Sequence, residues 1–202
     1  AENGVVMNSY PLVESLPDLG QWFTGHGYES VYSGKWHVPK RDVTRSFRFL
    51  PSGSGQGELG DGAVSRACQG YLANRTGSDP FFLTAGFLQP HDICYWIMQH
   101  ARDIGELPYP EIADELPELP PNFEFDGREP RAVIERQRRN NPGAAAYQWS
   151  KLHWRYYLWA YDRHVEMVDA EIGRVLDALD DSPHAKNTLV VFTSDHGEGR
   201  GR

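Results

Sequence analysis

Two short apolar runs constrain the fold of this chain more than any other feature. Residues 81–87 read Phe-Phe-Leu-Thr-Ala-Gly-Phe, and residues 187–193 read Asn-Thr-Leu-Val-Val-Phe-Thr. Runs of this kind between turn signals predict strands that are buried on both faces, as the strands of parallel sheets are. Residues 28–33 alternate between apolar and polar types and are rich in strand formers, so they predict a third strand.

A helical pattern precedes each predicted strand. Residues 16–23 carry helix-start signals after Ser15, and residues 61–72 carry an apolar face after a cap at Asp61. Residues 147–179 carry apolar side chains at three- and four-residue spacing. Three helix-then-strand units predict an α/β fold in which a mostly parallel sheet is sandwiched by helices.

Two segments break this pattern. Residues 52–62 contain five glycines, which predicts a mobile surface connection. Residues 105–142 contain seven of the fourteen prolines, and we expect them to form an irregular insertion within the domain.

Composition excludes several classes of protein. The chain has 202 residues and a net charge of −8, so it offers no broad cationic surface for nucleic acid. Its two cysteines cannot form a disulfide scaffold. Its longest apolar runs are far shorter than the roughly 20 residues of a membrane helix, so we expect no membrane span.

Polar residues of functional types follow each predicted strand. Lys35 and His37 follow the first strand, His91 follows the second, and Asp195 and His196 follow the third. Because ligands of open parallel sheets bind beyond the carboxyl ends of the strands, we expect these five side chains to meet at one edge.

The five side chains suit hydrolysis of a phosphate or sulfate ester. A lysine can hold a tetrahedral oxyanion, and a histidine can donate a proton to a leaving oxygen. Asp195 and His196 offer two ligands to a divalent cation. Taken singly, Lys35 also fits a solvated surface residue, His91 a turn residue and Asp195 a cap of the following turn.

The remaining histidines and the cysteines suggest no second site. We expect surface or helix-face positions for His26, His100, His153, His164 and His184. Cys68 lies on an apolar helical face and is expected in the core, whereas Cys94 lies in a loop without a paired base. Neither cysteine is expected to be a nucleophile.

Three segments, in order, resemble the sulfatase family of the alkaline-phosphatase-like superfamily. Residues 27–37, Gly-Tyr-Glu-Ser-Val-Tyr-Ser-Gly-Lys-Trp-His, resemble a long and specific sulfatase signature. Residues 80–91, from Pro-Phe-Phe-Leu to Gln-Pro-His, resemble the next segment of the family. Residues 169–198, which include Ser-Asp-His-Gly-Glu, resemble its metal-binding segment.

The resemblance implies a role for each candidate residue. Lys35 would contact the sulfate group and the nucleophile, His37 would orient the hydrated nucleophile, and His91 would contact the sulfate and the leaving-group oxygen. Asp195 and His196 would be calcium ligands.

The nucleophile implied by the resemblance is a formylglycine made in a Cys/Ser-x-Pro-x-Arg motif, which neither Cys68 nor Cys94 matches. We therefore expect residues 1–202 to be a partial catalytic domain that lacks the N-terminal nucleophile segment and the C-terminal subdomain. Such a chain is expected to be inactive alone.

Three functions remain open. The first is a calcium-dependent sulfatase that acts on sulfated carbohydrates, in a periplasmic, secreted or lysosomal setting as the resemblance implies. The second is a phosphonate or phosphodiester hydrolase, or a phosphoglycerol transferase, of the same superfamily. The third is a sulfated-glycan-binding pseudoenzyme, in which Trp96, Tyr109 or Trp149 could stack on sugar rings, although core packing is favoured for Trp149.

Overall fold

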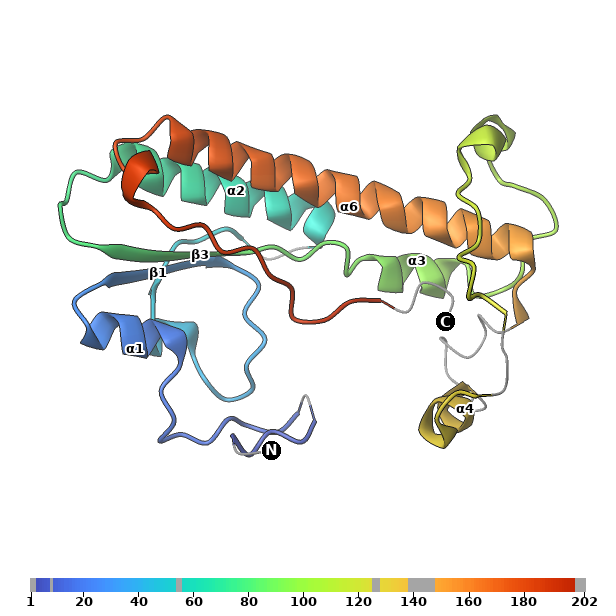
Figure 1. Cartoon of the computed structure of the whole chain (residues 1–202), viewed down its shortest axis with the longest axis horizontal. Helices are drawn as coiled ribbons and strands as arrows, with labels where there is room; N and C mark the ends of the chain where they lie inside the picture. Colours follow the sequence, from blue (N-terminus) through green and yellow to red (C-terminus); the bar gives the residue numbers. More distant parts are fainter. Residues whose placement is uncertain (1–2, 8, 54–55, 125–127, 138–147, 199–202) are drawn as a thin grey trace. The chain divides into compact units, whose positions relative to one another are not determined.

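The computed structural model describes residues 3–7, 9–53, 56–124, 128–137 and 148–198, shown in Figure 1. These residues divide into two units. Unit 1 takes in residues 1–89 and 167–188, and unit 2 takes in residues 90–166 and 189–202. Helix α6, Lys151–Asp180, contributes residues to both.

A parallel sheet lies at the centre of unit 1. Its strands are β1 (Glu29–Gly34), β2 (Arg48–Phe49) and β3 (Phe81–Gly86), in the order β2-β1-β3. Both pairs are parallel, and β1 and β3 are in register along their whole length. The predicted strands at residues 28–33 and 81–87 are therefore confirmed, and they are neighbours.

Helices cover both faces of this sheet, as the sequence predicts. Helix α2 (Gly57–Asn74) and the part of α6 in unit 1 lie on one face, and α1 (Leu19–Gly25) lies on the other (Figure 1). On the first face, Val31 packs in a buried cluster that also contains Tyr71, Leu72 and Leu179. Alternate strand residues face the other way, where Phe82 stacks on Phe23 of α1.

The predicted start of the first helix is wrong by a few residues. Asp18, not Ser15, is the N-cap, and it forms a capping box with Gln21. The Asp18 carboxylate accepts a hydrogen bond from the Gln21 N–H at 3.0 Å, while the Gln21 side chain accepts from the Asp18 N–H. Both exchange bonds satisfy N–H groups that a helix start otherwise leaves unpaired.

Helix α2 begins at Gly57, four residues before the predicted cap at Asp61. Residues 57–62 are therefore helical, and the predicted mobile connection is wrong for this part. Asp61 lies buried within the helix because its carboxylate has long-range backbone partners, described below.

The predicted strand at residues 187–193 is absent from the described structure. Residues 185–187 form a 3-10 helix, η4 (Ala185–Asn187), and residues 188–193 are assigned to neither a strand nor a helix. Leu189 and Phe192 are 88% and 80% exposed. A β-forming sequence becomes a strand only when a neighbouring strand pairs with its backbone, and no described residue does so.

Unit 2 is mainly helical. It contains α3 (Ile93–Gln99), the 3-10 helix η2 (Pro110–Glu115), α4 (Arg131–Gln137) and the first half of α6. Helical turns therefore interrupt the predicted irregular segment 105–142, of which residues 125–127 and 138–142 lie outside the described residues. No helix in the described ranges is both long and apolar enough to cross a bilayer.

We expect the change Gly34→Ala to destabilise the protein strongly. Gly34 has a φ of +104°, and an added Cβ would lie 2.0 Å from the carbonyl oxygen of Gly86. Strain and overpacking together predict a loss of about 2–4 kcal/mol in the free energy of unfolding, measured by urea denaturation. The control Gly173→Ala adds a Cβ in open space within α6 and should be stabilising by up to about 1 kcal/mol. Equal effects of the two changes would contradict this account.

Candidate functional site

Lys35 follows the end of β1, where two hydrogen bonds fix its backbone. Its N–H donates to the Gly86 carbonyl at 2.7 Å, which extends the ladder between β1 and β3 by one step. Its carbonyl accepts a hydrogen bond from the Tyr32 hydroxyl. The backbone of this half-buried lysine is therefore held at both its N–H and its carbonyl.

The surroundings of Tyr32 suit it to donate this hydrogen bond. Its ring packs edge-on against Trp36 and Phe47, with centroids 5.3 and 5.2 Å away. Burial raises the pKa of the Tyr32 hydroxyl, so the group stays protonated and remains a donor at neutral pH. From the sequence, Tyr32 was expected only as a residue of the strand at 28–33.

The loop that carries His37 is closed by further polar contacts. The Trp36 indole N–H donates to the Arg41 carbonyl at 2.7 Å. The Arg41 guanidinium is buried and donates to the carbonyls of Val13 and Leu16, both at 3.1 Å. His37 itself is exposed between these two anchored residues.

Asp18 completes this anchor. Its Oδ2 lies 3.3 Å from the Arg41 guanidinium. Burial would raise the pKa of Asp18, but hydrogen bonds from Ser46, the Gln21 N–H and Arg41 lower it below its usual value. The carboxylate is thus charged at neutral pH and neutralises the buried guanidinium.

The exit of β3 is also held by a buried carboxylate. Asp61 of α2 accepts the N–H groups of Leu88 and Gln89 at 2.7 and 2.9 Å. These residues directly precede the segment that leads to His91, which is exposed. Asp61 was predicted as a helix cap, and its role at a strand end 27 residues away left no signal in local sequence.

Asp195 and His196 lie together but do not form a calcium site by themselves. Their side chains are 74% and 69% exposed, and Asp195 Oδ2 lies 3.8 Å from His196 Nε2. Calcium binds six to eight oxygen ligands, and nowhere in the described ranges do three His, Cys, Asp or Glu residues gather as metal ligands. These two residues therefore do not fit calcium without further ligands.

The five predicted site residues fall in both units. Lys35 and His37 belong to unit 1, whereas His91, Asp195 and His196 belong to unit 2. Lys35 and His37 lie at the end of the same strand. The convergence of all five on one pocket stays a prediction.

The structure corrects the interpretation of His153. This side chain was expected on a surface or helix face, but it is fully buried and stacks on Trp149, with ring centroids 4.0 Å apart. Its Nδ1 accepts the Ile104 N–H at 3.2 Å and lies 3.4 Å from the Asp103 carboxylate. Burial lowers the pKa of His153, although Asp103 partly opposes this effect. Trp149 is a core residue, as expected.

Neither cysteine is placed as a nucleophile. Cys68 is fully buried, as predicted, and burial raises the pKa of its thiol to about 12. A thiol with this pKa holds almost no thiolate at neutral pH. Cys94 was expected in a loop, but it lies exposed in the first turn of helix α3.

The parallel sheet covered by helices defines an α/β protein, and comparison with known proteins identifies its family. The family model named Sulfatase matches residues 1–202, so the chain belongs to the sulfatase family. The family resemblance and the fold class predicted from the sequence are confirmed.

Named relatives support this membership. The chain is 32% identical over 200 residues to a Delta 4,5-hexuronate-2-O-sulfatase of Bacteroides thetaiotaomicron, covering 93% of this chain and 40% of that protein. It is 30% identical over 130 residues to the human iduronate 2-sulfatase, covering 61% of this chain and 22% of that protein.

A solved structure gives the same result. A 2-O GAG sulfatase superimposes with a TM-score of 0.84 at 28% identity, covering 99% of this chain and 45% of that one. The chain thus spans less than half the length of these relatives.

The change Tyr32→Phe should loosen the segment that carries Lys35 and His37. It removes one hydroxyl and its hydrogen bond to the Lys35 carbonyl but keeps the ring, so we expect a loss of about 1 kcal/mol. Hydrogen-exchange mass spectrometry should show faster exchange in residues 35–41. Tyr28→Phe is the control, because no described residue bonds to the Tyr28 hydroxyl. Similar exchange in both variants would show that the phenol does not anchor the loop.

Because His153 is buried, we expect the protein to lose stability at acid pH. The pKa of His153 is lowered in the folded state. In the unfolded chain the same imidazole has a pKa of about 6.5, so below this pH the unfolded state binds a proton that the folded state does not. The free energy of unfolding should therefore fall as pH drops from 7 toward 5, by at most about 1.4 kcal/mol per pH unit from this group. His153→Gln keeps an acceptor for Ile104 and should flatten this slope in urea titrations. His164→Gln, at a half-buried helix position, should keep it.

Proposed function

We propose that the protein to which this chain belongs hydrolyses sulfate esters of acidic carbohydrates. The observation that carries this proposal is the fixed backbone of Lys35 at the end of β1, within a segment that matches the sulfatase family. The carboxyl end of a parallel strand is where such folds bind their ligands.

Lys35 would contribute electrostatic stabilisation. A sulfate ester carries one negative charge, and charge builds up on the sulfate and bridging oxygens as the ester bond breaks. An ammonium group that is already oriented stabilises this charge without reorganising during the reaction. The two backbone hydrogen bonds of Lys35 fix the point at which its side chain leaves the end of β1.

His37 and His91 would act on protons and hydrogen bonds around the ester. In this proposal His37 orients the nucleophile, and His91 contacts the sulfate and donates a proton to the leaving sugar oxygen. The S–O ester bond breaks and one water is consumed overall, so the products are the sugar with a free hydroxyl group and inorganic sulfate.

Two further groups belong to the proposal by family resemblance. A formylglycine outside these 202 residues would supply the nucleophile, because the buried Cys68 and the Cys94 segment both lack the required motif. Asp195 and His196 would contribute to a calcium site whose other ligands come from elsewhere in the protein.

The names of the relatives support a substrate class. They are a hexuronate-2-O-sulfatase, an iduronate 2-sulfatase and a 2-O GAG sulfatase. We therefore propose a uronate-containing sulfated saccharide as the substrate, with the 2-O-sulfate as the first position to test.

The change Lys35→Ala in the full-length protein should lower kcat/KM on a 2-O-sulfated unsaturated uronate disaccharide by about 10²–10³-fold, because it removes a preorganised stabilising group. Release of inorganic sulfate measures the rate. Lys186→Ala removes an exposed lysine outside the proposed site and should leave the rate unchanged.

Three results would overturn parts of this proposal. Faster hydrolysis of a phosphate ester than of the matching sulfate ester would favour the phosphoryl-transfer alternative. Binding of the disaccharide by the full-length protein without turnover would indicate a pseudoenzyme. Turnover by residues 1–202 alone at the rate of an intact sulfatase would refute the need for a nucleophile outside them.

A further inference from the structure

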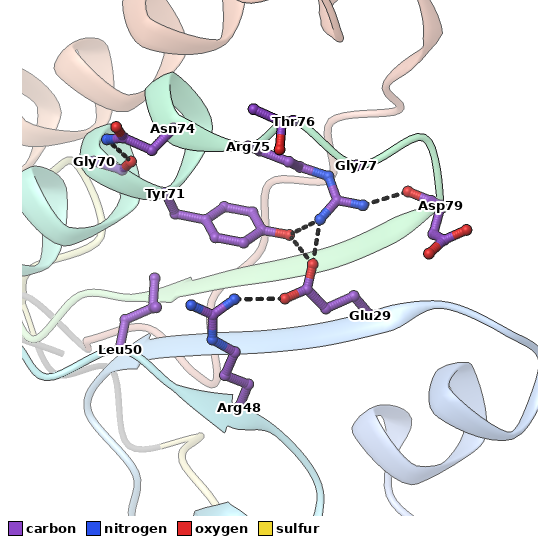
Figure 2. Close-up of a pocket in the computed structure, with 10 residues that line it drawn as sticks. All are labelled: Glu29, Arg48, Leu50, Gly70, Tyr71, Asn74, Arg75, Thr76, Gly77 and Asp79. Atoms are coloured by element: carbon purple, nitrogen blue, oxygen red, sulfur yellow. Dashed lines mark hydrogen bonds and ion pairs between the residues drawn. The ribbon is translucent and has the colours of Figure 1, made fainter.

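A polar hollow lies in unit 1 at the amino ends of β1 and β3, the opposite end of the strands from Lys35. It has a volume of about 600 Å³, and Figure 2 shows its lining. Glu29 is the first residue of β1, Arg48 lies on β2, and Tyr71 and Arg75 come from the end of α2.

Two arginines share one carboxylate in this hollow. Arg48 donates to Glu29 Oε1 at 2.7 Å, while Arg75 and the Tyr71 hydroxyl donate to Oε2. Burial alone would raise the pKa of Glu29, but the hydrogen bonds from Arg48, Tyr71 and Arg75 lower it. Glu29 is therefore ionised and fully engaged.

Arg75 and Arg48 differ in what they can still bind. The Arg75 side chain is only 6% exposed, lies over the ring of Phe81, and also donates to the Asp79 carbonyl. Its Nε is buried without a partner among the described residues. Arg48 is 64% exposed, and of the described residues only Glu29 bonds to its guanidinium.

The exposed side of Arg48 favours an anion. Glu29 engages one N–H group of this guanidinium, and the other N–H donors have no partner among the described residues. The Asp79 carboxylate also lines the hollow but points away from the Arg75 guanidinium in Figure 2. A planar guanidinium of this kind matches the oxygens of a carboxylate or a sulfate.

A second hollow of about 700 Å³ adjoins the first and shares Glu29 and Arg48 with it. It adds the half-exposed ring of Tyr28 and the side chains of Gln21, Thr44 and Arg45. An aromatic face together with amide and hydroxyl groups suits a sugar ring. Helix α2 lines the first hollow and α1 lines the second, so Arg48 borders a hollow on each face of the sheet. We name these two hollows together the Arg48 groove.

We propose that the Arg48 groove binds a carboxylate or sulfate group on a distant sugar of a sulfated polysaccharide, while another sugar of the same chain occupies the Lys35 end. This inference rests on the proposed function. Arg48 pairs in register with Val31, and Glu29 begins β1, so the groove lies roughly 13–20 Å along the strand from Lys35. A disaccharide in the site is too short to reach it.

The test compares long and short substrates in the full-length protein. Arg48→Gln should raise KM for heparin about five- to tenfold, as expected when one charge-assisted contact is lost, and should leave kcat unchanged. Both constants for the 2-O-sulfated disaccharide should stay at their wild-type values. Higher salt should reduce the difference between wild type and variant, because Arg48 is exposed.

Arg66→Gln is the matched control, since Arg66 is an exposed arginine of α2 outside both hollows. The proposed role of the Arg48 groove is wrong if Arg48→Gln leaves the KM for heparin unchanged. It is also wrong if Arg66→Gln raises this KM by the same factor. Thermal unfolding checks that both variants are folded.

Calorimetry with a heparin-derived hexasaccharide separates this proposal from the proposed function. In one outcome, the wild-type protein cleaves no sulfate ester but binds the hexasaccharide, and Arg48→Gln weakens this binding while Arg66→Gln does not. Binding by the groove is then supported and the enzymatic proposal fails. If the protein cleaves the disaccharide and the hexasaccharide binds wild type and Arg48→Gln equally, the groove fails alone.

Discussion

The close approach of two glycine backbones is the constraint on which the rest of unit 1 depends. Gly34 and Gly86 are the last in-register pair of β1 and β3, and neither position has room for a side chain. The strands can therefore stay in contact to their ends, and the Lys35 N–H adds one more bond to the ladder. The direction of the chain at Lys35 is therefore set by backbone contacts.

Buried polar groups extend this order from the strands into the loops. The Tyr32 hydroxyl, the Asp61 carboxylate and the Arg41 guanidinium each bond to backbone groups of a neighbouring loop. A buried group that loses its partner costs about 1–3 kcal/mol, so alternative loop conformations are disfavoured. The apolar layers determine which elements pack together, while these few polar contacts determine where the strand-end residues lie.

Local sequence predicted those features that arise from local chemistry. The buried strand at residues 81–87 and the place of Lys35 after β1 follow from residue type and order, and both are confirmed. Pairing is not local, so the run at residues 187–193 has the composition of a strand but no ladder partner in the part of the chain that the structure describes. The same reason explains Asp61 and His153, whose partners lie 27 or more residues away and leave no pattern nearby.

The charge of the chain explains why an anionic substrate would need two separate contacts. With a net charge of −8 the chain repels a polyanion at long range, and physiological salt screens exposed charges beyond about 8 Å. In the proposed function, Lys35 and Arg48 would therefore act independently. A contact made equally before and during the reaction strengthens binding only, whereas one at the reacting ester lowers the barrier. One end of the sheet can thus contribute to binding affinity and the other to the reaction rate. A change at either end need not disturb the other.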